Sequence, residues 1–392
     1  MWRRIELKNY RSIESARVDL APFTVLVGPN GSGKSNFADA LVFISELTDA
    51  SAAITRRGGI TGLRRWQRAP RGEVLLSLRV AASRAALDNN YTQYDCVIEF
   101  DQGKSWKFAS ESVDEVKDGA TVGTVSRGED GIVQLSPPQP VQLPPLAPQA
   151  SLALFLKQIS ILNSNKPMGI PAHGMRRYRL NPDEMRKPYL GSDEVFLNES
   201  GSNIAEAIDH LRKRKDGSYE DVLESMKRMV PGLVEIDTPK AGHYWTLEFN
   251  QRQATGGVAP FTAMEMSDGA LRALGILVAA RQLEPQAVLI VEEPEVHLHP
   301  GATAVLFEAL KQASQRGAVL ITTHSPELLD AAKDEELLVC DYRSGVTRVG
   351  PLDTEQRQIV REGLFSAAEL MRTTPLRIQG DAPATLEPPT TP

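Results

Sequence analysis

The pattern of apolar and polar positions in the first hundred residues predicts strands separated by one glycine-rich break. Residues 3–9 alternate as a half-buried strand does, whereas residues 23–27 (FTVLV) form the continuous apolar run of a strand buried on both faces. A glycine-rich turn and a helix over about 34–47 follow. Residues 73–80 and 94–100 alternate again, which is typical of antiparallel strands. The N-terminal part therefore combines a mainly β layer with a strand–turn–helix unit.

A stretch rich in Gly, Ser, Pro and Gln over 117–150 interrupts this pattern. Its segment PPQPVQLPPLAP (137–148) predicts a polyproline-type linker or an extended surface loop. Residues 151–232 then show short helical periodicities in SLALFLKQISIL, SNIAEAIDHLRKRK and SYEDVLESMKRMV, without a sustained heptad. We expect an inserted helical subdomain rather than a long coiled coil.

The C-terminal part contains three apolar runs, AVLIV (287–291), AVLITT (318–323) and ELLVCD (336–341). A β-like passage, HYWTLEF (243–249), and an apparent helix start at 267 precede them. From 287 onward the predicted order is strand, helix, strand, helix, strand, which is typical of an α/β protein with a parallel sheet.

Together these patterns predict an α/β protein with a mixed sheet, an N-terminal antiparallel β layer and an inserted helical subdomain. The predicted units are an N-terminal lobe, a Pro-rich linker, the helical subdomain, a C-terminal lobe and a disordered tail. They cover residues 1–135, 136–150, 151–240, 241–379 and 380–392.

Composition narrows the function class without naming it. The 392 residues are 41% hydrophobic and 24% charged, with a net charge of −6, which is ordinary for a globular protein and unlike a basic nucleic-acid coat. The N-terminus lacks an apolar leader core, and the longest apolar run, Leu274–Ala280, is too short to span a bilayer. Cys96 and Cys340 lie in strand-like contexts and are expected to be buried and reduced. We expect a cytoplasmic protein without a membrane partner.

The glycine-rich break, GPNGSGKS (Gly28–Ser35), matches the phosphate-loop pattern G-x-x-x-x-G-K-[ST] at every fixed position. Its glycines let backbone N–H groups turn around a phosphate, and the following helix adds the partial positive charge of its N-terminus. Lys34 can reach the β- and γ-phosphates of ATP, and the Ser35 hydroxyl can bind Mg²⁺. The alternative, a glycine turn with a chance lysine, is disfavoured by the flanking strand and helix. The predicted nucleotide-binding residues are Asn30, Gly31, Ser32, Gly33, Lys34, Ser35 and Asn36.

The stretch EEPEVHLHP follows an apolar strand and admits two interpretations. Its acids and histidines could bind a metal by themselves, but a zinc site wants three or four ligands and H-x-H on a turn supplies two. Alternatively, Glu292 binds Mg²⁺ directly or through water, and Glu293 positions the water that attacks the nucleotide. We favour the second interpretation, in which Glu295, His297 and His299 shape the turn.

Two further segments could contact a bound nucleotide. Ser267-Asp268-Gly269, the SDG segment, can cap a helix and so offer a second helix N-terminus to an anion, although an ordinary capped helix explains it as well. His324 follows the run 318–323, where its side chain can hydrogen-bond a γ-phosphate or the attacking water. The predicted catalytic residues are Glu293, His324 and Lys34.

Along the chain the phosphate loop, the SDG segment, the acids Glu292 and Glu293, and His324 follow one another. Sequences with these four elements in this order resemble ABC-type ATPases of the SMC-like, RecF-like and OLD-like branch. The residues that carry the resemblance are SDG.LR from Ser267, EEPE..LHP from Glu292 and the opening IELKNYRSIES. Glu292 stands where many ABC proteins have Asp, and the glutamine that the family uses between metal and water cannot be placed. The 68 residues after His324 are too few for a fused Toprim nuclease.

The resemblance implies a P-loop ATPase head that uses ATP and Mg²⁺ and forms a homodimer on ATP. Each nucleotide would then lie between the phosphate loop of one subunit and Ser267, Asp268 and Gly269 of the other. Leu298-His299-Pro300 would cross the interface, and His324 would be the switch histidine. Compact members often accompany a separately encoded effector in phage-defence or toxin-like gene pairs, so such a partner is expected.

Three basic groups could bind DNA or another nucleic acid, although a solvated basic face is the simpler interpretation of each. The preferred group, in residues 56–71, holds a tryptophan and Arg56, Arg57, Arg64, Arg65, Arg68 and Arg71. A second group comprises Arg176, Arg177, Arg179, Arg186 and Lys187, and the third is RKRK at 212–215.

Three functions remain open on this sequence. The first is a dimeric ATPase that gates a DNA-related or anti-phage effector. The second is a scaffold that binds ATP with negligible turnover. The third is a transporter energy subunit, which predicts a compact head, whereas 258 positions separate Lys34 from Glu292.

Overall fold

One large sheet organises the protein. The computed structural model describes residues 2–63, 74–83, 90–100, 105–136, 141–143, 145–154, 156, 174–285 and 287–380. Fourteen of the described strands form this sheet, in the order β10-β17-β18-β3-β19-β20-β2-β1-β4-β5-β6-β7-β8-β9. Its first five strands run parallel to their neighbours, and the strands from β1 to β9 pair antiparallel.

The parallel half is built from β10 (Met175–Tyr178), β17 (Val288–Glu292), β18 (Ala318–Thr323), β3 (Phe23–Val27) and β19 (Leu337–Arg343). Helices α9 (Pro300–Ala313) and α10 (Pro326–Ala331) connect β17 to β18 and β18 to β19. The predicted strand–helix alternation in the C-terminal part is therefore confirmed. The N-terminal strand β3 lies between β18 and β19, so segments from the two ends of the chain share one sheet.

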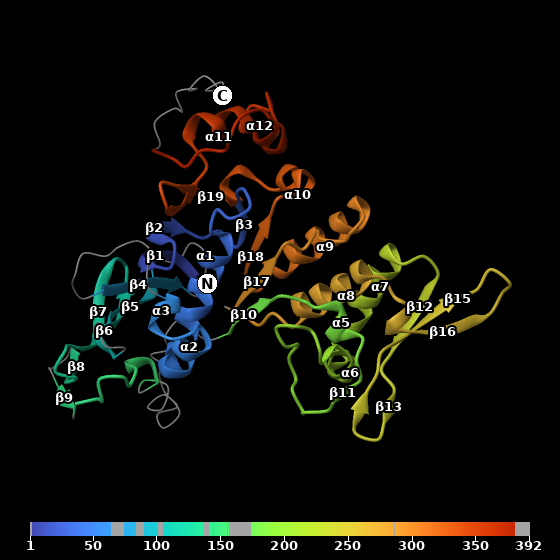
Figure 1. The fold of residues 1–392 in the computed structure, drawn as a ribbon, viewed down its shortest axis with the longest axis horizontal. Helices are drawn as coiled ribbons and strands as arrows, with labels where there is room; N and C mark the ends of the chain where they lie inside the picture. Colours follow the sequence, from blue (N-terminus) through green and yellow to red (C-terminus); the bar gives the residue numbers. More distant parts are fainter. Residues whose placement is uncertain are drawn as a thin grey trace.

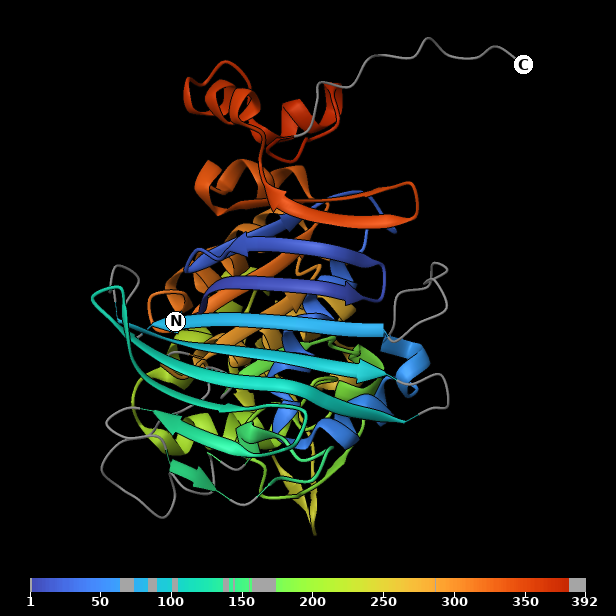
Figure 2. The same cartoon turned by 90° about the vertical axis from the view of Figure 1, so that its left-hand side faces the viewer.

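The antiparallel half extends the sheet as a broad layer (Figure 2). Its strands are β20 (Val346–Pro351), β2 (Ile13–Asp19), β1 (Trp2–Tyr10), β4 (Val74–Ser83), β5 (Tyr91–Phe100), β6 (Trp106–Lys117), β7 (Ala120–Arg127), β8 (Val133–Ser136) and β9 (Val141–Leu143). The predicted alternating strands are thus confirmed as β1, β4 and β5. The Pro-rich segment differs from its prediction, because its central residues form β9 and pair with β8 at the edge of the sheet.

The apolar strands of the parallel half bury side chains on both faces. In β3, Val25 and Val27 join the core under α8 (Asp268–Arg281) and α9, whereas Leu26 joins the core under α1 (Lys34–Ser45). In β17, Leu289 and Val291 likewise face one core and Val288 and Ile290 the other. This two-sided burial explains why both strands read as continuous apolar runs.

The region between β10 and β17 carries the expected helices and more strand than expected. Two predicted helices are confirmed as α6 (Ile204–Arg214) and α7 (Ser218–Met229), which pack together with α8 (Figure 1), and a short α5 (Pro182–Met185) precedes them. SLALFLKQISIL lies largely outside the described residues. Two small sheets complete the region: β11 (Tyr189–Leu190) with β14 (Tyr244–Trp245) and β13 (Lys240–Ala241), and β12 (Leu233–Asp237) with β15 (Glu248–Arg252) and β16 (Val258–Thr262).

Short elements complete the fold. Beside α1 lie η1 (Leu47–Asp49), α2 (Ala50–Arg56) and α3 (Ile60–Leu63); η2 (Ala263–Glu265) precedes α8, and η3 (Asp334–Glu336) precedes β19. The C-terminal segment forms α11 (Thr354–Arg361) and α12 (Ala367–Thr373), with a turn between them. No helix in the described ranges is long and apolar enough to cross a membrane. The predicted tail from 381 onward lies outside the described residues.

Candidate active site

The carboxyl ends of four parallel strands bring the predicted residues to one edge of the sheet. The phosphate loop follows β3, Glu292 ends β17, His324 follows β18, and Arg179 follows β10. Since parallel strands end at the same edge, residues distant in the sequence become neighbours there, as in other open α/β sheets.

Backbone conformation and a supporting hairpin shape the phosphate loop. Gly31 and Gly33 have φ of +76° and +105°, which a residue with a side chain adopts only with strain. A Cβ at Gly33 would lie 2.2 Å from Thr347 Oγ1. The Thr347 hydroxyl donates to Ser32 O at 2.8 Å, and Cys340 Sγ lies 3.4 Å from the same oxygen. The β19–β20 hairpin, which the sequence did not connect with this loop, therefore holds it in place.

The loop is suited to a phosphate. Lys34 Nζ donates to the carbonyls of Gly28 (2.8 Å) and Pro29 (3.1 Å), which hold the ammonium across the loop. Burial lowers the pKa of Lys34 from its ordinary value, while the Cys340 thiol and the acids of the site oppose that change. Ser32 Oγ is buried and has no hydrogen-bond partner within the described part of the chain. A buried hydroxyl without a partner and a lysine over a glycine-rich turn fit a bound phosphate.

Glu292 and Ser35 meet across 257 residues of sequence. The Ser35 hydroxyl donates to Glu292 Oε2 at 2.5 Å, and Arg179 Nε donates to Glu292 Oε1 at 2.8 Å. Hydroxyl and carboxylate oxygens are the ligands that Mg²⁺ prefers, so this pair fits the predicted magnesium site. Among the described residues, no group of three His, Cys, Asp or Glu side chains could hold a metal without a nucleotide.

Glu293 is held at a strained position beside His324. Its φ is +48°, and its backbone N–H donates to Thr322 O at 2.9 Å. Its Oε1 lies 3.1 Å from His324 Nε2, so the two residues that the sequence singled out for chemistry are in contact. Because a non-glycine residue at positive φ is costly, this conformation is typical of a functional position.

Glu295, His297 and His299 organise the turn that follows the acids. Glu295 Oε1 accepts hydrogen bonds from Thr323 Oγ1 (2.6 Å) and the His324 backbone (3.1 Å), which ties the turn to the end of β18. His299 caps α9 by accepting from the Gly301 N–H at 3.2 Å. His297 adopts a φ of +67°. These contacts agree with the predicted role in shaping the turn.

The SDG segment caps α8 and lies against the same turn. Ser267 Oγ accepts from the Ala270 N–H at 3.2 Å, so the predicted cap is present. A Cβ at Gly269 would lie 2.3 Å from His297 O. Asp268 is paired with Arg186, whose hydrogen bond lowers the pKa of Asp268 from its ordinary value. The segment thus borders the turn after the acids and leaves Asp268 half exposed to solvent.

Most of the described basic residues have structural partners. Arg57, one of the preferred nucleic-acid candidates, is buried, and its guanidinium contacts Asp39 at 3.1 Å and Glu46. This corrects its interpretation as a surface contact, because a buried paired guanidinium cannot reach a nucleic acid. Arg56 is exposed beside Glu46. The remaining candidates, Arg64, Arg65, Arg68 and Arg71, lie outside the described residues.

Several residues of the second and third basic groups also pair with acids. Arg177 contacts Asp39 and Glu199, Arg179 contacts Glu292, and Arg186 contacts Asp268. The strand β10 therefore delivers arginines to the active-site edge, which sequence reasoning missed. Arg177 and Arg179 are two positions apart, as residues on one face of a strand are, and this spacing was the signal in the sequence. In the RKRK group, Arg212, Lys213 and Arg214 pair with neighbouring acids.

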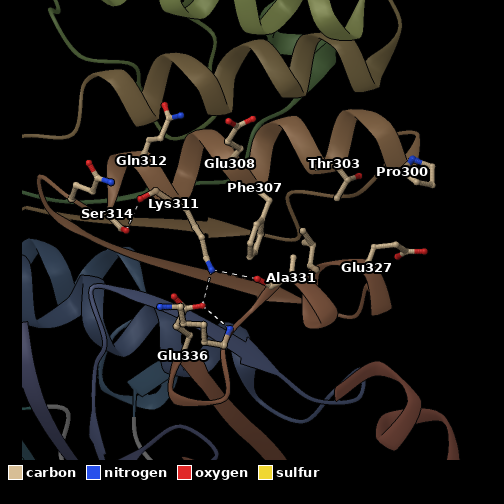
Figure 3. A pocket seen from close by; sticks show the side chains of 14 residues that line it. Pro300, Thr303, Phe307, Glu308, Lys311, Gln312, Ser314, Glu327, Ala331 and Glu336 are labelled. Atoms are coloured by element: carbon tan, nitrogen blue, oxygen red, sulfur yellow. Dashed lines mark hydrogen bonds and ion pairs between the residues drawn. The ribbon is translucent and has the colours of Figure 1, made fainter. Parts of the chain in front are cut away.

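A cavity of about 600 Å³ lies elsewhere, between α9, α10 and η3 (Figure 3). Lys311 crosses it, with Nζ 3.3 Å from Ala331 O and 3.0 Å from Glu336 Oε2. Its lining includes none of the phosphate-loop residues, the acids Glu292 and Glu293, or His324. We therefore place the chemistry at the edge of the sheet and not in this cavity.

Comparisons with known proteins point to ATPase domains. A family model described as "AAA domain, putative AbiEii toxin, Type IV TA system" matches residues 149–330, and one described as "AAA ATPase domain" matches residues 1–103. The Old nuclease of Escherichia phage P2 is 23% identical over 351 residues, covering 83% of this chain and 57% of that protein. The OLD nuclease of Thermus scotoductus is 24% identical over 353 residues, covering 86% and 61%. The chain thus spans about three fifths of these relatives.

Among solved structures, an SMC head bound to the C-terminal winged-helix domain of ScpA matches with a TM-score of 0.56 at 14% identity. That match covers 91% of this chain and 99% of the SMC head, so the two share a fold. The ATPase-domain models, the OLD nuclease relatives and the SMC-head fold together support an SMC-, RecF- and OLD-like P-loop ATPase.

Proposed function

We propose that this protein binds ATP with Mg²⁺ and hydrolyses it to ADP and phosphate at the edge formed by β3, β17 and β18. The observation that carries the proposal is the meeting of Ser35 with Glu292 and of Glu293 with His324 beside the phosphate loop. A loop that only bound nucleotide would not need a second, strained acid in contact with a histidine.

Each residue has a defined task in this proposal. The phosphate-loop N–H groups and Lys34 bind the β- and γ-phosphates, and Ser35 with Glu292 holds the magnesium ion, which neutralises charge on the transferred phosphoryl group. Glu293 orients the attacking water and accepts its proton, while His324 fixes the Glu293 carboxylate. The bond from the γ-phosphorus to the β–γ bridging oxygen breaks, and ADP leaves with the electron pair.

We propose further that two copies dimerise over ATP, each offering its SDG segment to the nucleotide of the other. The half-exposed Asp268 and the adjacent exposed His297 support this, since a second subunit can reach them. We also propose that the dimer gates a separately encoded effector in a DNA-related or defence function. The nuclease names of the relatives and the toxin description of one family model support that choice.

Phosphate release from ATP tests the proposal. Wild-type protein should hydrolyse ATP with Mg²⁺, and Glu293→Gln should lower the rate by about a hundredfold or more, because general-base catalysis contributes that much. Lys34→Ala should abolish nucleotide binding. Glu308→Gln, an exposed acid on α9, is the matched control and should keep the wild-type rate. Turnover that persists in Glu293→Gln would contradict the proposal.

A further inference from the structure

Arg179 stands beside the carboxylate that the proposed function assigns to magnesium. It follows β10, the strand next to β17 in the sheet, and its Nε donates to Glu292 Oε1 at 2.8 Å. The other oxygen of Glu292 accepts from Ser35 at 2.5 Å. Both carboxylate oxygens therefore have a partner, and one partner is a full positive charge.

The two hydrogen bonds of Glu292 differ in how they respond to a metal; a second guanidinium, that of Arg177, lies 4.0 Å from Oε1. A serine hydroxyl can donate to a carboxylate and still offer a lone pair to Mg²⁺, so the Ser35 contact is compatible with the metal. The guanidinium of Arg179 has no acceptor and repels a divalent cation at the same carboxylate. Magnesium and Arg179 therefore compete for Glu292.

A guanidinium displaced from Glu292 has a new anion within the same site. The phosphate loop lies next to Glu292 through Ser35, and a terminal phosphate bound there would be dianionic or nearly so. Arginine pairs with phosphate through two parallel N–H donors, which makes it the favoured side chain for that contact. The Arg179 side chain is half exposed to solvent, so packing does not enclose it at Glu292.

We propose that Arg179 is a residue that distinguishes ATP from ADP: it moves from Glu292 to the terminal phosphate of ATP when magnesium binds. This inference rests on the proposed function, because it needs ATP and magnesium at this site. ADP lacks the third phosphate, so Arg179 would contribute to ATP binding and not to ADP binding.

Equilibrium binding of a non-hydrolysable ATP analogue and of ADP, each with saturating Mg²⁺, tests the proposal on the full chain. Arg179→Ala should weaken binding of the analogue by about tenfold or more, as expected for a charge-assisted hydrogen bond, without weakening ADP. Arg179→Gln, which removes the charge but keeps a polar side chain, should behave in the same way. Lys187→Ala, at an exposed basic residue that follows α5 and pairs with Glu184, is the control and should leave both affinities unchanged.

The outcomes separate the two claims. Equal weakening of analogue and ADP, or no weakening of either, would overturn the role of Arg179 while leaving ATP binding through Lys34 intact. Wild-type protein that binds neither nucleotide would overturn the proposed function, and this inference with it. Melting curves that match wild type show that the variants are folded.

Discussion

Asp39 shows at the level of single residues why part of this protein could not be predicted from sequence. Its carboxylate accepts from Tyr10 at 2.6 Å and contacts Arg11, Arg57 and Arg177. The phosphate loop was predictable because its eight positions are contiguous. The arginines that contact the carboxylates of Asp39 and Glu292 come from segments distant in the sequence. Only the fold therefore shows whether such an arginine is paired with an acid.

Arg57 should contribute to the stability of the fold and not to nucleic-acid binding. Because its side chain is buried against two carboxylates, Arg57→Ala removes charge-assisted hydrogen bonds from Asp39 and Glu46 and should lower the free energy of unfolding by about 1.5–3 kcal/mol. The exposed neighbour Arg56 is the control, since Arg56→Ala should change it by less than about 1 kcal/mol. Urea unfolding of both variants measures this. Equal effects would show that Arg57 is not a buried ion-pair residue.

Asp39 should also make stability depend on pH in acid. Burial would raise the pKa of Asp39, but the hydrogen bond from Tyr10 and the nearby Arg57 and Arg11 lower it overall below the ordinary 3.8. The unfolded carboxyl binds its proton first as pH falls, so the stabilisation is present at neutral pH and is lost through the lower folded-state pKa. Melting temperatures of wild type and Asp39→Asn should differ at pH 7 and begin to converge as the pH falls below about 4. A gap independent of pH would refute this.

At the level of elements, the strands of the parallel half were predicted correctly. Strands buried on both faces of a sheet are continuous apolar runs, which are easy to recognise in a sequence. The Pro-rich segment was misread because its overall composition hides a short stretch without proline that can join the edge of a sheet. Val141–Leu143 takes that place, pairing on one side with β8. Turns such as that between α11 and α12 escape periodicity because apolar residues there, Leu364 and Phe365, are exposed.

The contact between α8 and the turn after the acids is a second element-level prediction. Gly269→Ala would place a Cβ 2.3 Å from His297 O and should destabilise the protein by about 1–3 kcal/mol through overpacking. Gly301→Ala is matched, because its Cβ would meet only His299 Nδ1 at 3.6 Å and alanine favours the helix. Thermal unfolding compares them. A loss as large in Gly301→Ala would show that helix position, and not the close approach, sets the cost.

At the level of the whole molecule, the α/β class and the antiparallel layer followed from periodicity, but the joining of both into one sheet did not. The order β19-β20-β2-β1 connects the last and first strands of the chain, and no local pattern encodes such pairing. The proposed dimer depends on this arrangement, because the sheet edge presents the phosphate loop while α8 presents the SDG segment beside the turn after the acids.

The mass of the Glu293→Gln variant in solution, with and without Mg²⁺ and ATP, tests the central claim most directly. Trapping a dimer requires ATP at the phosphate loop, arrested hydrolysis at Glu293 and a site for the second subunit, so one measurement tests all three. Light scattering should show the mass of two chains with ATP and of one chain without it. Adding Lys34→Ala should abolish the dimer. A mass that ATP leaves unchanged, or a dimer that survives Lys34→Ala, would contradict the account.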